Sequence, residues 1–348
     1  MFKLCLCIPT MNRAQFIGQT LDSIVPELGT DVEVVIVDGS PDDTTEKVVS
    51  KYQEQHAAIR YFRRTNGSDG PSNAGFDRDC NWAVELAQAD YCWLMTDDDL
   101  LKPGAVRQVV ARLDEGHDLL VVACEIRDEN LHEILLRARP VLAGDVVFRP
   151  SQWEQFFSAA ITHLTFVGAV VIRRSVWASR NPAAFFGSGF VHVGMIFSSP
   201  MQQSVLMLAQ PLVVIRYGNA QWCDRAFKIF MYDWPQLVWS FPGIPDAAKR
   251  AVTPREPWRV WRVLMLQRAY GRYSIDEYRR HLHKNLSLAA RIVPRIIAFT
   301  PRLLLYVPAR VYGHFRHFDS RLFVRVLNSA LHQSHRAAAP QRDDQILP

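Results

Sequence analysis

The chain has 348 residues, of which 49% are hydrophobic and 22% are charged, and its net charge is +5. This is ordinary globular composition, with enough chain for a sizeable core in two domains or in one domain with an appendage. The six cysteines include no CxxC pair, which disfavours a zinc site or a disulfide framework and fits a reducing cytoplasm. The apolar N-terminal stretch of residues 1–9 is too short for a signal peptide and predicts a first buried strand.

Charge is unevenly distributed along the chain. Residues 1–254 carry a net charge of −6 (23 basic, 29 acidic), residues 255–336 carry +12 (16 basic, 4 acidic), and the last twelve carry −1. The two parts of the chain are therefore expected to face different partners.

Strands and helices alternate in the first hundred residues. Apolar runs predict strands over residues 2–9, 32–37 and 59–62 and a strand ending at Asp97, and helical spacing predicts helices from Phe16 to Val25 and over residues 44–52 and 80–89. This alternation predicts a parallel α/β sheet, in which ligands bind beyond the carboxyl ends of the strands. Asp38, the polar loop 66–79 and the triplet 97–99 all fall at that edge.

The pattern continues with less regularity. We predict a helix over residues 104–115, strands over 119–124, 166–172 and 211–217, a helix over 194–210, and basic helices over 255–285. No GxxxxGK[ST] phosphate loop is present.

The triplet Asp97, Asp98 and Asp99 directly follows an apolar run. Adjacent carboxylates repel one another, so the cluster is costly unless a cation or hydrogen bonds compensate it. Hard oxygen ligands suit Mg²⁺ or Mn²⁺. The alternative is a solvated acidic turn or helix cap.

Four segments in order carry a resemblance to a known family: IPTMNR (8–13), VVIVDGSPDDT (34–44), SNAGFDRDCNWAVELAQADY (72–91) and WLMTDDDLLKPG (93–104). Together they resemble the GT-A nucleotide-diphospho-sugar transferase domain of glycosyltransferase family 2, over roughly residues 1–220. Residues 172–177 and 216–222 are similar to the abequosyltransferase-like subgroup, which builds bacterial surface polysaccharides. The resemblance implies an α/β GT-A fold, a mostly parallel Rossmann-like sheet flanked by helices. We expect a catalytic domain over 1–222, a basic helical membrane-associating region over 223–332 and a flexible tail over 333–348.

The resemblance also assigns the donor-binding residues. It implies that Thr10 and Asp38 bind the base and ribose of the nucleotide, although Asp38 also suits a turn cap. Arg78 suits a phosphate because its fork engages two oxygens, and the alternative for it is a surface arginine. The rest of the implied donor-binding set is Asn12, Arg13, Ser40, Asp77, Asn81 and Asp98.

The same resemblance implies a metal and a role for it in the reaction. Asp99 would ligate a divalent metal, Mg²⁺ or Mn²⁺, through the diphosphate, and Asp97 would act as a catalytic residue that holds sugar hydroxyls or a metal-bound water. The metal would neutralise the charge that develops on the leaving diphosphate.

The general base is where the sequence departs from the family. The family inverts the anomeric centre and usually supplies a carboxylate from a Glu-Asp pair, but residues 187–195 hold no carboxylate. His192 is the best substitute because imidazole titrates near neutral pH, and the alternative is a buried structural histidine. His163 and Asp224 are weaker candidates.

Residues 286–312 form a largely apolar segment that is long enough to span a bilayer. Four arginines lie within it: Arg291, Arg295, Arg302 and Arg310. Each central arginine costs about 2.5–3.5 kcal/mol on insertion scales, so short helices lying on an anionic membrane surface, within residues 255–316, fit better. The alternative is a helical domain packed on the first one with solvated arginines. No nucleic acid partner is expected, because the segment is aliphatic and proline-punctuated and lacks a nucleic-acid-binding motif.

These features predict an inverting, metal-dependent glycosyltransferase. It would move a sugar from a nucleotide-diphosphate donor to a hydroxyl of a polyprenyl-diphosphate-linked saccharide in O-antigen or surface-polysaccharide synthesis, at the cytoplasmic face of the cell membrane. One alternative is a nucleotidyltransferase, which would need a glycine-rich phosphate loop that residues 9–13 lack. Another is a non-catalytic membrane-bound GT-A scaffold, since the Glu-Asp pair is missing.

Overall fold

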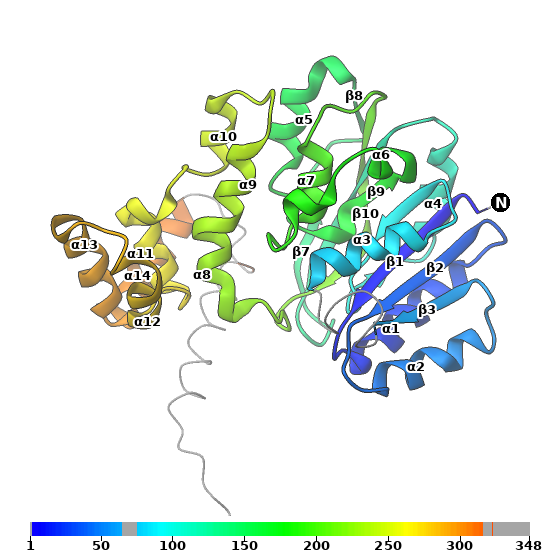
Figure 1. The fold of residues 1–348 in the computed structure, drawn as a ribbon, viewed down its shortest axis with the longest axis horizontal. Helices are drawn as coiled ribbons and strands as arrows, with labels where there is room; N and C mark the ends of the chain where they lie inside the picture. Colours follow the sequence, from blue (N-terminus) through cyan, green and yellow to red (C-terminus); the bar gives the residue numbers. More distant parts are fainter. Residues whose placement is uncertain (1, 65–74, 316–321, 323–348) are drawn as a thin grey trace, which may run out of the picture. The chain divides into compact units, whose positions relative to one another are not determined.

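The structure is a computed structural model that describes residues 2–64, 75–315 and 322 (Figure 1). Its contacts divide the chain into two compact units. The first unit comprises residues 1–219 and 233–255, and the second comprises residues 220–232 and 256–348. The predicted tail over 333–348 lies outside the described residues.

A mixed sheet forms the core of the first unit. Ten strands of the described chain run in the order β3-β2-β1-β4-β9-β6-β10-β5, with β7 paired to β6 and β8 to β10. They are β1 (Leu4–Thr10), β2 (Val32–Asp38), β3 (Ile59–Arg63), β4 (Tyr91–Leu94), β5 (Leu100–Leu101), β6 (Leu119–Arg127), β7 (Ile134–Arg139), β8 (Val146–Phe148), β9 (Val170–Arg173) and β10 (Val205–Arg216).

The parallel part of the sheet sets the position of the site. β1 lies between β2 and β4 and is parallel to both, and every residue of β1 and β2 is buried. A strand buried on both faces reads as a continuous apolar run, which explains why both were predictable from sequence. The register pairs Thr10 with Asp38, so the two predicted nucleotide contacts end side by side at one edge.

Helices cover this sheet. Contacts place α3 on β1 and β2, and α1 against α2 and β5; Figure 1 shows α1 beside α2. The helices of this unit are α1 (Ala14–Ile24), α2 (Thr44–Gln53), α3 (Phe76–Leu86), α4 (Ala105–Leu113), α5 (Trp153–Ala160), α6 (Arg174–Ala178), α7 (Val191–Phe197), α9 (Trp234–Ser240) and α10 (Asp246–Val252).

One predicted element is wrong. Residues 194–210 do not form a helix: α7 ends at Phe197, and the chain enters β10 at Val205. Pro200 disfavours helix at the residue before it, and β10 gains a parallel partner in β6. Strand limits also differ: β4 ends at Leu94, β6 continues to Arg127, and β9 begins only at Val170, after a short 3₁₀ turn.

The second unit is helical, as predicted. Its helices are α8 (Ala226–Lys228), α11 (Trp261–Ala269), α12 (Ile275–Glu277), α13 (Leu288–Phe299) and α14 (Arg302–Phe315). Phe227 stacks on Tyr273 with ring centroids 4.9 Å apart, and Leu264 and Leu282 complete the buried core around them. Within the described residues, no single helix is both long and apolar enough to cross a membrane, although α13 and the start of α14 meet that test together with a 90° bend between them.

Candidate active site

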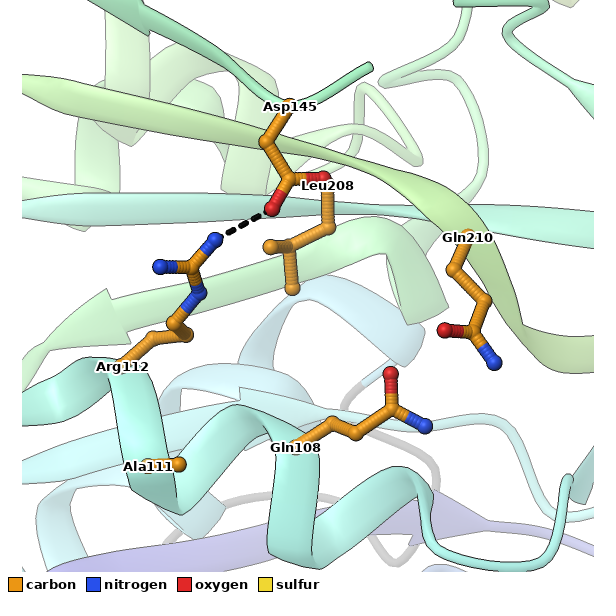
Figure 2. A pocket seen from close by; sticks show the side chains of 6 residues that line it. All are labelled: Gln108, Ala111, Arg112, Asp145, Leu208 and Gln210. Atoms are coloured by element: carbon orange, nitrogen blue, oxygen red, sulfur yellow. Dashed lines mark hydrogen bonds and ion pairs between the residues drawn. The ribbon is translucent and has the colours of Figure 1, made fainter.

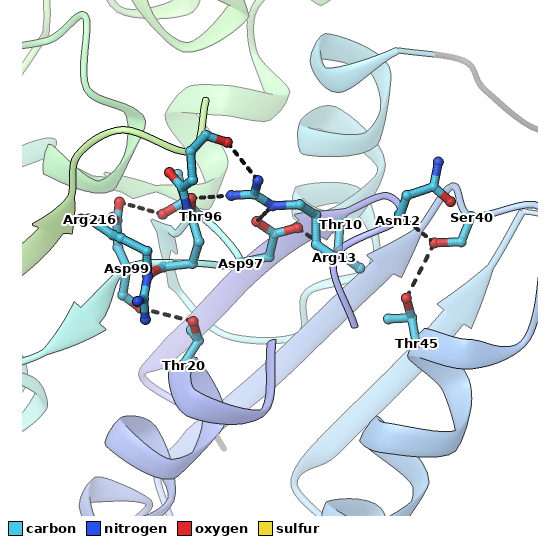
Figure 3. Close-up of polar contacts among 12 residues, drawn as sticks. Thr10, Asn12, Arg13, Thr20, Ser40, Thr45, Thr96, Asp97, Asp99 and Arg216 are labelled. Atoms are coloured by element: carbon cyan, nitrogen blue, oxygen red, sulfur yellow. Dashed lines mark hydrogen bonds and ion pairs between the residues drawn. The ribbon is translucent and has the colours of Figure 1, made fainter. Parts of the chain in front are cut away.

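The carboxyl ends of β1, β2 and β4 meet at one edge of the sheet, and the acidic triplet follows β4 there. The Thr10 hydroxyl donates a 2.7 Å hydrogen bond to Asp97 Oδ2, which joins the end of β1 to the triplet (Figure 3). Asp97, Asp98 and Asp99 are all buried. The structure therefore places the triplet where the strand pattern predicted it.

A buried guanidinium neutralises part of the triplet. Arg13 Nε lies 3.3 Å from Asp97 Oδ1, and Arg13 Nη2 forms an ion pair with Asp98 Oδ2. The third arm, Nη1, donates a 2.9 Å hydrogen bond to the Asn219 carbonyl. Arg13 was predicted as a nucleotide contact, and here it bridges the acidic loop to the chain that follows β10.

Asp99 is fixed on both carboxylate oxygens. The Thr96 hydroxyl donates to Oδ2 at 2.5 Å, and the Arg216 backbone N–H donates to Oδ1 at 2.8 Å (Figure 3). The Thr20 hydroxyl donates to the Asp99 carbonyl at 2.9 Å. Only 2% of Asp99 is exposed, so this residue holds the acidic loop in shape.

Arg216 is a site residue whose role the sequence did not show. Its Nε donates to the Asp98 carbonyl at 3.1 Å, Nη1 to the Glu129 carbonyl at 2.9 Å, and Nη2 to Gln19 Oε1 at 2.5 Å. The residue stands at the end of β10, and only the strand order reveals that this end meets the acidic loop.

Burial and mutual repulsion raise the pKa values of the acidic loop. Burial, and then repulsion from Asp98, raises the pKa of Asp97 to about 7, although Arg13 and Thr10 act in the opposite direction. Burial and the same neighbour raise the pKa of Asp99 to about 8. The loop therefore favours any added positive charge.

The residue types of this loop fit a divalent metal, because carboxylate oxygens are the ligands that Mg²⁺ and Mn²⁺ prefer. In the part of the chain that the structure describes, no three His, Cys, Asp or Glu side chains are arranged as a ready metal site. The geometry gives the reason: Arg13 holds Asp97 and Asp98, while Thr96 and Arg216 hold Asp99. A metal at this loop would therefore compete with Arg13 for the carboxylates of Asp97 and Asp98.

The second group of predicted donor contacts surrounds the end of β2. Asp38 is fully buried and accepts hydrogen bonds from Ser40 N at 2.7 Å and from the Tyr61 hydroxyl at 2.6 Å. Ser40 Oγ accepts from Asn12 N at 2.8 Å and lies 3.3 Å from the Thr45 hydroxyl (Figure 3). Asn12 has a positive φ of 56° and an exposed side chain, so it projects from the loop that Ser40 fixes.

The third group lies on α3 and divides by role. The Asp77 carboxylate accepts backbone hydrogen bonds from Gly187, Gly189 and Val191 at 2.8–3.0 Å and so anchors the loop before α7. These contacts do not support the expectation that Asp77 contacts the nucleotide.

The other two α3 residues differ from each other. Asn81 accepts from Trp177 Nε1 at 2.9 Å and donates to Glu85 at 2.7 Å, so its amide is engaged at both ends within the fold. Arg78 is exposed and stacks over the Phe186 ring at 4.6 Å. Of the three, Arg78 is the one that remains suited to a phosphate.

The histidine chosen as general base is part of the core. His192 is 1% exposed, and its Nε2–H donates to the Leu164 carbonyl at 2.9 Å. Burial lowers its pKa to about 4. A ring with no exposed edge cannot receive a proton from an arriving acceptor, so the geometry does not support His192 as the base and favours a structural role.

Of the two weaker candidates, His163 resembles His192. His163 is equally buried, bonds the Val122 carbonyl at 2.8 Å and has a pKa lowered to about 4 by burial. Asp224 belongs to the second unit, and its role as a base stays a prediction.

A shallow cavity of about 260 Å³ lies elsewhere on the first unit, between α4 and β10 (Figure 2). Arg112 and Asp145 form an ion pair at its wall, and Gln108 and Gln210 face it. None of the predicted site residues lines it, and small-molecule sites usually enclose about 300–1,000 Å³. It does not compete with the acidic edge as the candidate site.

An acidic loop beyond the parallel strands of such a sheet is compatible with a sugar-nucleotide transferase domain, and sequence comparison shows this class. The chain belongs to glycosyl transferase family 2, whose model matches residues 5–180, from β1 through β9. The chain is thus a glycosyltransferase rather than a nucleotidyltransferase.

Within the family, the chain is similar to the abequosyltransferase RfbV of Salmonella typhimurium, with 24% identity over 231 residues, 62% of this chain and 67% of that protein. It is also similar to the GalNAc(5)-diNAcBac-PP-undecaprenol beta-1,3-glucosyltransferase of Campylobacter jejuni, with 28% identity over 128 residues. That match covers 37% of this chain and 40% of the relative's length.

Solved structures support the fold. S. aureus TarS 1-349 in complex with UDP-GlcNAc superposes with a TM-score of 0.53 at 12% identity, covering 98% of this chain and 93% of that one. The mannosyltransferase PcManGT from Pyrobaculum calidifontis in complex with GDP-Man and Mn²⁺ gives a TM-score of 0.52 at 15% identity, covering 97% and 88%. The predicted GT-A fold is confirmed.

Proposed function

We propose that this enzyme is an inverting, metal-dependent glycosyltransferase of bacterial surface-polysaccharide synthesis. Its donor is a nucleotide-diphosphate sugar, and its acceptor is a hydroxyl of a polyprenyl-diphosphate-linked saccharide at the cytoplasmic face of the membrane. The observation that carries the proposal is the buried acidic loop 97–99 at the carboxyl edge of β1, β2 and β4.

Donor binding would use the side chains left available at this edge. Asn12 and Arg78 are exposed, and the Arg78 guanidinium suits the diphosphate because its planar fork engages two oxygens. A divalent metal, Mg²⁺ or Mn²⁺, would be held by the carboxylates of Asp97 and Asp98. Asp99, predicted from the resemblance as a ligand, would instead hold the loop in shape, because Thr96 and Arg216 engage both of its carboxylate oxygens. When bound, it would supply positive charge to the leaving diphosphate.

The lipid-linked acceptor is supported by similarity and by charge. The C. jejuni relative is named for a polyprenol-diphosphate substrate, and S. typhimurium RfbV for abequose transfer. Residues 255–336 of this chain carry a net charge of +12, which suits the diphosphate of such an acceptor and an anionic membrane surface. This charge supports peripheral attachment, in the region 255–316.

A carboxylate is a better candidate than His192 for the general base that activates the acceptor. Glu129 lies in the turn after β6, its side chain is exposed, and its carbonyl accepts from Arg216, which also binds the Asp98 carbonyl. The Glu129 side chain lies next to Gly218, in the chain that follows β10, and an exposed carboxylate there is open to an acceptor hydroxyl, as a general base must be. We therefore propose Glu129 as the base.

Transfer assays test this function. The purified full chain is incubated with UDP-, GDP-, CDP- and dTDP-sugars, Mn²⁺ and polyprenyl-diphosphate-linked saccharides, and products are identified by mass spectrometry and anomeric NMR. We expect inverted product from one donor, loss of transfer in Asp97→Asn, and a kcat at least about 100-fold lower in Glu129→Gln with little change in donor KM. Asp114→Asn, at an exposed ion pair with Lys3, is the control and should retain full activity. Metal-independent transfer, or a retained anomer, would contradict the proposal.

A further inference from the structure

Helix α13 exposes one apolar face. Leu288, Ile292, Val293, Ile296 and Phe299 are between 50% and 79% exposed. Its opposite side is buried, with Ile297 and Ala298 in the core of the second unit. At 100° per residue the exposed set forms one stripe, so the helix is apolar on both sides and the unit's own core uses only one of them.

Helix α14 repeats this arrangement. Leu303, Leu304, Val307 and Val311 are between 49% and 70% exposed, whereas Leu305 and Ala309 are buried beside Ala269 of α11. The exposed set of α13 and that of α14 are together called the α13–α14 apolar surface below. Exposed apolar surface of this extent marks an interaction site.

The geometry of the two helices is that of elements lying on a membrane. With 12 and 14 residues they measure about 18 and 21 Å, short of the ~30 Å hydrocarbon core. A 90° bend separates α13 from the start of α14, so the pair does not form one straight span. Each helix is long enough to lie in the interface with its apolar side in the acyl boundary.

Charge along the edge of the surface favours anionic lipid. Arg291 and Arg295 lie on α13 between its buried side and its exposed stripe, and Arg295 and Lys284 are exposed. Long basic side chains at such an edge reach lipid phosphates while their stems rest on apolar surface. A second copy of the chain would bring like charges together, since residues 255–336 carry +12, so lipid is the better occupant.

We infer that the α13–α14 apolar surface inserts into the interfacial layer of an anionic bilayer and anchors the chain there. This inference rests on the membrane location in the proposed function and names the surface that provides it. It concerns only the second unit and does not depend on sugar transfer. The surface acts as a shallow wedge, with its arginines at the level of the phosphates.

Flotation of the full chain with vesicles tests this inference. The vesicles are phosphatidylcholine alone or mixed with phosphatidylglycerol, and the variant is Ile296→Ser with Leu304→Ser, both exposed positions whose change should not disturb the core. We expect the double variant to bind mixed vesicles at least about tenfold more weakly than wild type. Val141→Ser, an apolar residue of the first unit that is 81% exposed, is the matched control and should bind as wild type does.

The charge component has its own variant. Arg295→Gln should weaken binding to mixed vesicles about fivefold and leave binding to phosphatidylcholine alone unchanged. Nucleotide-diphosphate binding by the same variants separates the two proposals, because it should stay intact whatever happens to flotation. Undiminished flotation of the double variant overturns the inference. The inference is also overturned if the wild-type chain binds neither kind of vesicle and the double variant sediments differently from it. The α13–α14 apolar surface would then be an interface between copies of the chain.

Discussion

At the scale of single residues, two arginines organise the acidic loop. Arg13 pairs with Asp97 and Asp98, and Arg216 binds Asp99 and the Asp98 carbonyl through its backbone and side chain. Both arginines are buried, and the ion pairs of Arg13 leave an uncompensated buried charge if either partner is removed. Arg13 is therefore expected to stand in for part of the charge that a divalent metal supplies.

The Arg13 guanidinium offsets the repulsion among the buried carboxylates of residues 97–99, so its removal should destabilise the fold. We expect Arg13→Ala to lower the free energy of unfolding by roughly 3–5 kcal/mol without metal, because a buried charge loses its partner. Mn²⁺ should restore part of this stability. Urea unfolding with and without Mn²⁺ measures both effects. Lys3→Ala, at the exposed pair with Asp114, should cost less than about 1 kcal/mol. Equal, metal-insensitive losses in the two variants would show that Arg13 does not neutralise the site.

His192 gives a pH-dependent prediction. Burial lowers its pKa in the folded chain to about 4, below the ordinary value of 6.5, so as the pH falls the unfolded chain binds the proton first. The contribution of neutral, buried His192 to the free energy of unfolding is fully present above pH 6.5. It is lost as the pH falls towards 4, by up to about 3 kcal/mol.

The variant His192→Gln isolates this contribution. Subtracting its unfolding free energies from those of the wild type between pH 4 and 7 removes the opposite trend of Asp97 and Asp99, whose pKa values are raised. We expect a difference that grows as pH rises and a transfer rate per folded molecule that is little changed. A stable variant with kcat reduced 100-fold would return His192 to the role of base.

At the scale of elements, the residues of α3 show what the sequence allowed and what it did not. The strands β1, β2 and β4 were predictable because each is a buried apolar run, and the parallel register then brought Thr10 and Asp38 together. The anchoring role of Asp77 was not predictable, because the backbone N–H groups that donate to its carboxylate belong to residues 187–191, more than a hundred residues away. The helix predicted over 194–210 failed because a short apolar run is ambiguous until its strand partner, here β6, is known.

Neighbouring residues on α3 should behave differently when replaced. Asp77→Ala leaves three backbone donors without their acceptor and should lower stability by roughly 2–4 kcal/mol. Arg78→Ala should change stability by less than about 0.5 kcal/mol but weaken nucleotide-diphosphate binding by about tenfold or more. Urea unfolding and calorimetric titration of both variants provide the test. Weakened binding in Asp77→Ala at full stability would instead support the nucleotide contact predicted for Asp77.

At the scale of the whole molecule, each of the two units is built from two separate segments of the chain. Residues 233–255 pack in the first unit although residues 220–232 belong to the second. Phe241 contacts Phe157 and Phe197, and Trp234 contacts Phe190, with ring centroids 4.9–6.4 Å apart. The family resemblance predicted a catalytic domain over residues 1–222, and a resemblance along the sequence cannot show that residues 233–255 return to the first unit.

Truncations test this arrangement. A chain ending at residue 222 loses Trp234 and Phe241 and exposes their aromatic partners, so we expect it to aggregate or to melt at least about 10 °C below a chain ending at residue 255. Differential scanning fluorimetry and size-exclusion chromatography compare the two. Equal melting temperatures and equal solubility would mean that residues 233–255 contribute nothing to the first unit.

The central claim is that the acidic loop at the sheet edge binds a metal and a nucleotide diphosphate together. Calorimetric titration of the full chain with UDP, GDP, CDP and dTDP, with and without Mn²⁺, tests it most directly. We predict that one nucleotide binds at least about tenfold more tightly with Mn²⁺ and that Asp97→Asn abolishes this gain. Binding that is the same without metal and in the variant, or no binding of any nucleotide, would contradict the account.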